Sequence, residues 1–65
     1  MKIQVNGEAR ELDGTTIEDA LNAFGFGGAK VATALNGDFV PAGLRTTTKL
    51  NEGDRLEVLA PMQGG

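Results

Sequence analysis

One segment of this 65-residue chain has the apolar period of an amphipathic helix, and it needs a sheet to cover it. Thr15 and Glu18 have the spacing of a capping box, and Gly25 is typical of a left-handed helix end. We therefore expect a helix over residues 16–24. A helix with a narrow apolar stripe buries that stripe only against another layer of structure. The stripe consists of Ile17, Ala20, Leu21 and Phe24.

Alternating polar and apolar residues before this segment predict a hairpin. Residues 1–5 alternate, Asn6-Gly7 is a strong two-residue turn signal, and residues 8–12 form a return strand. The return strand is mostly polar, which suits the edge of a sheet. The pairs that this turn places across the hairpin are Lys2 with Glu11 and Met1 with Leu12.

Three further strands follow the helical segment. We expect the two longer strands over residues 31–36 and 55–60. A short strand is expected over residues 39–40, after the Asn36-Gly37 turn signal. Residues 41–50 predict a loop or a single helical turn. This order predicts an α+β fold in which one helix packs on a mixed sheet and the last strand returns beside the first. The residues expected against the helix are Ile3, Val5, Val31, Leu35, Leu56 and Val58, with Met1 and Leu12 at the margin.

The composition excludes several kinds of chemistry. The chain has no cysteine for a disulfide or thiol, and no histidine for a common zinc site or a near-neutral general base. Its net charge of −3 argues against nucleic-acid binding, which needs a basic patch. No apolar run reaches the ~18 residues of a membrane span, and residues 1–5 do not resemble a signal peptide, so we expect a cytoplasmic protein. A chain this poor in catalytic side chains is expected to bind or carry, with no bound metal or cofactor, rather than to be an enzyme.

The sequence ends in Gly64-Gly65, five residues after the last predicted strand. Because residues 61–65 have little to pack against, we expect a β-sheet domain over residues 1–60 and a flexible tail over 61–65. Five extended residues reach at most ~17 Å, and glycines pass through a narrow channel. The tail offers its α-carboxylate, which adenylation by ATP activates so that a nucleophile displaces AMP. Taken alone, the Gly-Gly end fits a frayed terminus as well as a reactive one.

Five stretches of the chain, taken together, match the pattern of a known family. They are residues 3–8, 16–21, 34–41, 50–58 and 64–65. No single stretch is specific, but Asn-Gly followed by Val-Pro, Gly-Asp-Arg and a final Gly-Gly at this spacing is fairly specific together. On these residues the chain resembles the ThiS family of sulfur carrier proteins, which are ubiquitin-like β-grasp proteins of thiamine biosynthesis. The resemblance implies one main helix packed on a four- to five-stranded mixed sheet, with the first and last strands parallel at its centre.

The resemblance also implies a chemistry and a set of partners. The C-terminal glycine, here Gly65, is adenylated by a ThiF-type adenylating enzyme that uses ATP, and is converted to a thiocarboxylate with sulfur from a sulfur-donating enzyme. The sulfur then passes to a ThiG-type thiazole synthase. Gly64 carries over with Gly65, and we expect Met62 and Gln63 to contact these partners too. The free carrier is expected to be a monomer.

Leu59 is a further candidate for partner binding. Val58 and Ala60 are expected to face the helix, so Leu59 points from the opposite face of the last strand. An apolar side chain on an open sheet face, beside a functional tail, favours a docking contact. Cover by the segment 41–50 would explain an apolar residue there equally well.

Two other functions are compatible with the sequence. The first is that of the MoaD family, the small subunits of molybdopterin synthase, which are related β-grasp carriers that end in Gly-Gly. The proline at position 61 of the tail is similar to what that family has. That family is generally longer, and the stretch 36–41 fits ThiS better. The other function is a non-carrier β-grasp binding module whose Gly-Gly end is incidental. Adenylation at the C-terminus by a cognate enzyme distinguishes a carrier from such a module.

Overall fold

The computed structural model describes residues 1–27 and 30–60 of the chain. The predicted tail, residues 61–65, lies outside the described residues. The elements in chain order are β1 (Lys2–Val5), β2 (Glu8–Glu11), α1 (Ile17–Ala23), β3 (Ala32–Leu35), β4 (Asp38–Val40), the 3-10 helix η1 (Ala42–Leu44) and β5 (Arg55–Leu59).

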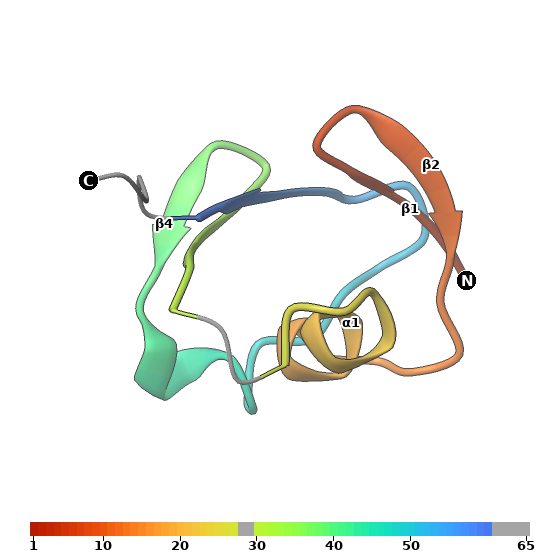
Figure 1. The fold of residues 1–65 in the computed structure, drawn as a ribbon. Helices are drawn as coiled ribbons and strands as arrows, with labels where there is room; N and C mark the ends of the chain where they lie inside the picture. The colour runs from red at the N-terminus through yellow and green to blue at the C-terminus, as the bar shows by residue number, and fades with distance from the viewer. Residues whose placement is uncertain (28–29, 61–65) are drawn as a thin grey trace.

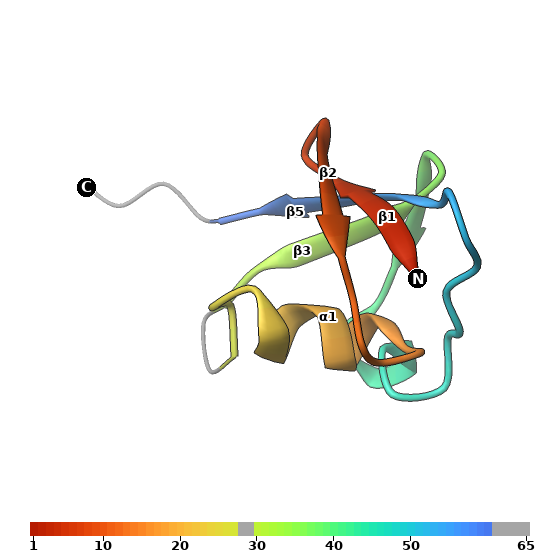
Figure 2. The ribbon, with the colours of Figure 1, turned by 90° about the vertical axis from the view of Figure 1, so that its right-hand side faces the viewer.

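The five strands form one mixed sheet in the order β2-β1-β5-β3-β4, and α1 lies across one of its faces (Figures 1 and 2). β1 and β5 run parallel at the centre, and the other neighbouring strands run antiparallel. This arrangement confirms the α+β, β-grasp fold expected from the sequence. In the described part of the chain, no helix has the length and apolar character to cross a membrane.

The first hairpin has the expected register. Lys2 lies opposite Glu11, and the backbones of Met1 and Leu12 exchange two hydrogen bonds of 2.8 Å. β2 is exposed along its length and forms an edge of the sheet, as its polar sequence predicts. At the turn, Asn6 and Gly7 have φ of 51° and 85°, the left-handed conformation that favours asparagine and glycine.

The capping box predicted at Thr15 and Glu18 is wrong by one residue. Thr16 is the N-cap: its hydroxyl accepts from the Asp19 amide at 3.1 Å, and the Asp19 carboxylate accepts from the Thr16 amide at 3.1 Å. Both pairs have the required spacing, so the local sequence does not choose between them. The segment before β5 does, because Thr16 is extended and forms a β-bridge with Lys49, and the Ile17 amide donates to the Thr48 carbonyl at 3.2 Å.

The end of the helix is as predicted. Gly25 has φ of 88°, and the amide of Phe26 donates to the carbonyl of Leu21 at 2.8 Å. This bond is the outer one of a Schellman motif, which satisfies a carbonyl that the helix leaves unpaired. The chain is thereby turned back toward β3.

Ten apolar side chains are buried among the described residues, and most were predicted. Leu12 was expected at the margin but is only 3% exposed, because the chain passes there from the sheet down to α1 (Figure 2). Val31 and Leu35 are only partly buried, since Leu35 is the last residue of β3 and Val31 lies just before its first. The core residues that the sequence analysis missed are Thr33, Val40 and Leu50.

Truncation of Leu21 tests this core. Leu21→Ala should lower the free energy of unfolding by roughly 2–5 kcal/mol, because it removes buried methyl groups and leaves a cavity. Leu59→Ala is the matched control, since the same truncation on an exposed leucine should change stability by no more than about 0.5 kcal/mol. Urea unfolding followed by circular dichroism measures both. Equal stabilities of the two variants would contradict the assignment of Leu21 to the core.

The N-cap predicts a pH dependence of stability. Hydrogen bonds from the Thr15 and Thr16 amides and the Thr16 hydroxyl lower the pKa of Asp19 below its ordinary value of 3.8. A lowered pKa in the folded state gives stability that is present above the unfolded pKa and is lost as the pH falls through the folded pKa. The Tm difference between wild type and Asp19→Asn should therefore be largest near neutral pH and narrow below pH 3.8. Asp38→Asn on β4 controls for the loss of one charge, and a Tm difference for Asp19→Asn that stays constant with pH would refute the prediction.

Candidate functional site

The structure describes the chain up to Ala60, just before the segment that carries the predicted reactive group. Met62, Gln63, Gly64 and Gly65 lie outside the described residues. The last residues that the structure does describe are Val58 and Leu59 of β5 and then Ala60, and we call these three the tail base. The site is therefore built from what surrounds the tail base.

Leu59 lies on the face of the sheet opposite α1. Burial alternates along β5, so Leu56 and Val58 face the core and Leu59 is 73% exposed. The alternative in which the segment 41–50 covers Leu59 is therefore wrong. Its role in partner binding stays a prediction.

Phe39 joins Leu59 on this open face and was not predicted. In register, Leu59 lies opposite Ala32, and Phe39 lies opposite Ala34 on the next strand pair. Both large side chains are more than two-thirds exposed, with Phe39 at 70%, and a hollow of about 340 Å³ lies between them. On β4 only Val40 is buried, so its neighbour Phe39 points to the opposite face, and the sequence analysis had predicted neither. We call Ala32, Ala34, Phe39 and Leu59 the outer patch.

A second, open pocket of about 600 Å³ lies beside the tail base. Leu59 and Ala60 line it together with the basic side chains of Lys30 and Arg45. Arg45 is held in place, because its guanidinium donates to the Val31 carbonyl and, through Nε at 3.2 Å, to the Thr33 hydroxyl. The tail base thus lies between the outer patch, whose hollow Glu57 also lines, and a pocket that contains the fixed guanidinium of Arg45.

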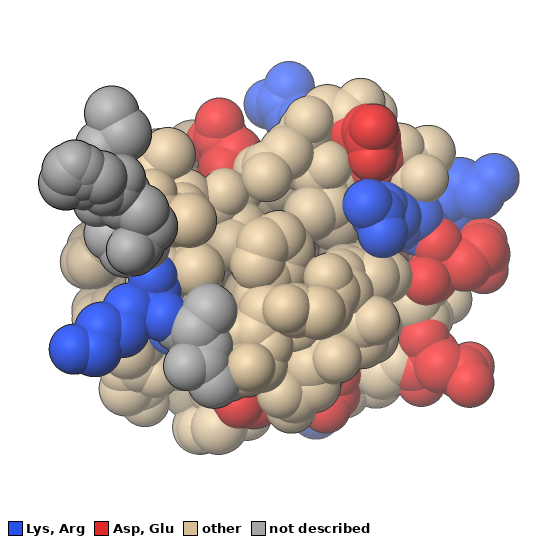
Figure 3. All heavy atoms as spheres, in the orientation of Figure 1, with Lys and Arg blue, Asp and Glu red and all other residues tan. Residues whose placement is uncertain are grey.

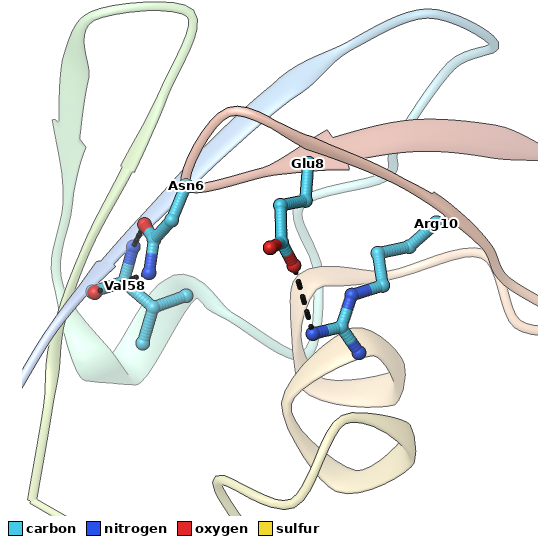
Figure 4. Close-up of polar contacts among 4 residues, drawn as sticks. All are labelled: Asn6, Glu8, Arg10 and Val58. Carbon is cyan, nitrogen blue, oxygen red and sulfur yellow. Dashed lines mark hydrogen bonds and ion pairs between the residues drawn. The ribbon is translucent and has the colours of Figure 1, made fainter.

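The amide side chain of Asn6 bridges to the tail base (Figure 4). Its Oδ1 accepts from the Val58 amide at 2.8 Å, and its Nδ2 donates to the Val58 carbonyl at 3.1 Å. Figure 4 also shows the exposed ion pair of Glu8 and Arg10 on β2, whose N···O distance is 3.3 Å. Such an exposed pair contributes little. The Asn6 side chain, in contrast, links the first hairpin to the end of β5.

The described residues around this site can be searched for metal ligands and for clustered charge. Among the described residues, no three His, Cys, Asp or Glu side chains come together as a metal site would need. On the face shown in Figure 3, acidic and basic side chains alternate along one side and the middle is uncharged, so the described residues there form no continuous basic patch. What the arrangement offers is a rigid support for the segment that follows Ala60.

Comparison with known proteins gives a consistent result. The sequence profile of the ThiS family matches residues 3–65. The sulfur carrier protein ThiS of Thermus thermophilus is 39% identical over 64 residues, which cover 97% of this chain and 98% of that protein. The crystal structure of the thiamine biosynthesis protein ThiS from Geobacter metallireducens matches all of both chains, with a TM-score of 0.82 at 30% identity.

Two longer proteins contain a region similar to this chain. The thiazole synthases of Paramagnetospirillum magneticum and Magnetococcus marinus are 36% and 39% identical to it over 66 aligned positions. Each alignment spans the whole of this chain but only 20% of the longer protein. The chain thus corresponds to about a fifth of these two proteins.

Proposed function

Because the chain belongs to the ThiS family, we propose that it carries sulfur for thiamine biosynthesis on the carboxyl group of Gly65. The observation that carries this proposal is the family match, which runs through residue 65 on a β-grasp fold of the same shape as a solved ThiS. The family match also favours this pathway over the molybdopterin alternative. The chain is a co-substrate of other enzymes and not itself a catalyst.

The chemistry takes place on the terminal carbonyl carbon. A carboxylate oxygen of Gly65 attacks the α-phosphate of ATP in a ThiF-type adenylating enzyme, and pyrophosphate leaves. Hydrosulfide supplied by a sulfur-donating enzyme then attacks the carbonyl carbon and gives up its proton, and AMP leaves with the former carboxylate oxygen. The product is a thiocarboxylate, whose sulfur passes to a ThiG-type thiazole synthase. The absence of cysteine from the chain supports this route, because no side-chain thiol is available to carry the sulfur.

The longer relatives support a physical association with the synthase. Each of these proteins is named thiazole synthase, and a region similar to this chain is part of its polypeptide. Joining a carrier to the enzyme that uses it raises their effective concentration. We expect the carrier to bind the synthase and the adenylating enzyme in turn, as a monomer in the cytoplasm.

The outer patch provides the docking surface for the adenylating enzyme. Leu59 and Phe39 are large, apolar and exposed, and an exposed apolar cluster is typical of a protein interface. Leu59 also lies within the tail base, so docking there brings the segment 61–65 to the partner. Gly64, Gln63 and Met62 then line the path of Gly65 into the adenylation site.

Deletion of Gly65 tests the chemistry. The full-length chain, supplied with ATP, the ThiF-type enzyme and a sulfur donor, should exchange one oxygen for sulfur, which intact-mass spectrometry detects. The chain that lacks Gly65 should not react, because its carboxylate stops about 3.8 Å short of the adenylation site. Its stability should change by no more than about 0.5 kcal/mol, as is usual when a terminal residue is removed.

Two outcomes would reject the carrier function. One is a full-length chain that never gains the thiocarboxylate, and the other is a truncated chain that gains it as readily. In either case the binding-module alternative would replace the carrier. Adding the loaded chain to the thiazole synthase and assaying thiazole phosphate then separates the thiamine pathway from the molybdopterin pathway.

Substitution of Leu59 tests the docking surface. Leu59→Asp should weaken binding to the ThiF-type enzyme about tenfold or more, because it places a charge in an apolar contact. Leu44→Asp is the matched control, since Leu44 is also exposed, at 52%, but lies on η1 outside the outer patch. Titration calorimetry gives both affinities. Unchanged affinity in a folded Leu59→Asp would show that the enzyme docks elsewhere.

A further inference from the structure

Strand β5 extends beyond the backbone of its partner β1. The two strands pair only at Gln4 with Arg55 and at Val5 with Leu56. The chain then turns away at Asn6, while β5 continues to Leu59. On its other side, β5 stays paired with β3 up to its last residue. One side of β5 would therefore lose its partner before the strand ends.

The Asn6 side chain takes the place of the missing backbone partner. The amides of Gln4 and Asn6 donate to the carbonyls of Asp54 and Leu56, at 2.9 and 3.0 Å, so alternate residues of β5 face β1. Val58 is the next residue in this series. Its amide and its carbonyl both pair with the Asn6 side chain, in the way a peptide group of a neighbouring strand would pair with them.

We propose that Asn6 is a positioning residue for the carrier reaction, whose side-chain bridge to Val58 holds the end of β5, after which the segment that carries Gly65 follows. The role rests on the proposed function, because it concerns how the reacting carboxyl group is presented. The bridge holds Val58 on the side where β1 has turned away, and the pairing with β3 holds Leu59 on the other side. The end of β5 is therefore held from both sides only while the bridge is present.

Loss of the bridge has two consequences for the reaction. Without it, β5 beyond Leu56 is held only by its pairing with β3, so the end of the strand opens more readily. An open strand end lowers the effective concentration of the carboxyl group at a partner's active site. Leu59 is also held less firmly in the outer patch, because it follows Val58 directly and keeps only its pairing with Ala32.

The second Asn-Gly turn provides a matched control at the other end of the same strand. Asn36 has φ of 50°, close to the 51° of Asn6, and its Oδ1 accepts from the Arg55 amide at 2.9 Å. Asn6→Gly and Asn36→Gly thus each keep a left-handed turn without strain and each remove a side-chain bond to β5. Only the first lies beside the tail base.

Steady-state adenylation by the ThiF-type enzyme compares the two variants at a temperature where both are folded. Asn6→Gly should raise the KM for the carrier about tenfold and leave kcat within about twofold, since chemistry at Gly65 is unaltered once it arrives. Asn36→Gly should leave both constants within about twofold. Asn6→Asp, which keeps the acceptor for the Val58 amide but lacks the donor, should give an intermediate KM, and it replaces Asn6→Gly if that variant does not fold.

Hydrogen exchange provides a readout that does not depend on the reaction. The Val58 amide should exchange at least about tenfold faster in Asn6→Gly and be unaffected in Asn36→Gly. Unchanged Val58 exchange, or a KM that rises equally in both glycine variants, overturns the positioning role alone. A wild-type chain that is not adenylated overturns the proposed function and the positioning role with it.

Discussion

The parallel pairing of β1 with β5 is the contact on which the rest of the structure depends. It joins the two ends of the chain, and each strand contributes two of the buried side chains on which α1 packs. Without it, the first hairpin and the β3–β4–β5 unit would be separate small sheets, which are marginal in water. Everything between the two strands acts as one long connection, whose closure entropy the shared core must offset. The four side chains are Ile3, Val5, Leu56 and Val58.

Features with a local cause were predicted from the sequence, and features with a distant cause were not. Both Asn-Gly turns and the Gly25 helix end follow from backbone conformations that few residues adopt. The helix start was placed one residue early, because the contact that distinguishes Thr16 from Thr15 is a β-bridge to Lys49, far away in the sequence. Leu50 has no periodic neighbours, and it is buried where its amide donates to the Thr15 carbonyl at 2.7 Å, which holds an irregular segment beside the start of the helix.

The same distinction applies to the candidate site. The terminal glycines and the outward direction of Leu59 follow from composition and strand parity, which the sequence contains directly. The outward direction of Phe39 was missed together with the burial of Val40, and its position beside Leu59 depends on two strand pairings that no local pattern specifies. Asn6 was predicted only as a turn residue, since its second contact lies on a strand at the far end of the chain.

The alternating burial along β5 gives some of its side chains to the stability of the fold and another to the proposed sulfur transfer. The Asn6 side chain contacts the end of this strand, where both kinds of residue lie. Leu56 and Val58 serve the core, whereas Leu59 faces the opposite side, so one short strand contributes to both surfaces. The turn at position 6 would accept glycine, aspartate or asparagine equally, because each tolerates a left-handed backbone. Of these three, only asparagine offers an acceptor and a donor together, as the free edge of Val58 requires. The identity of this side chain is therefore explained by the end of β5 and not by the turn in which it lies.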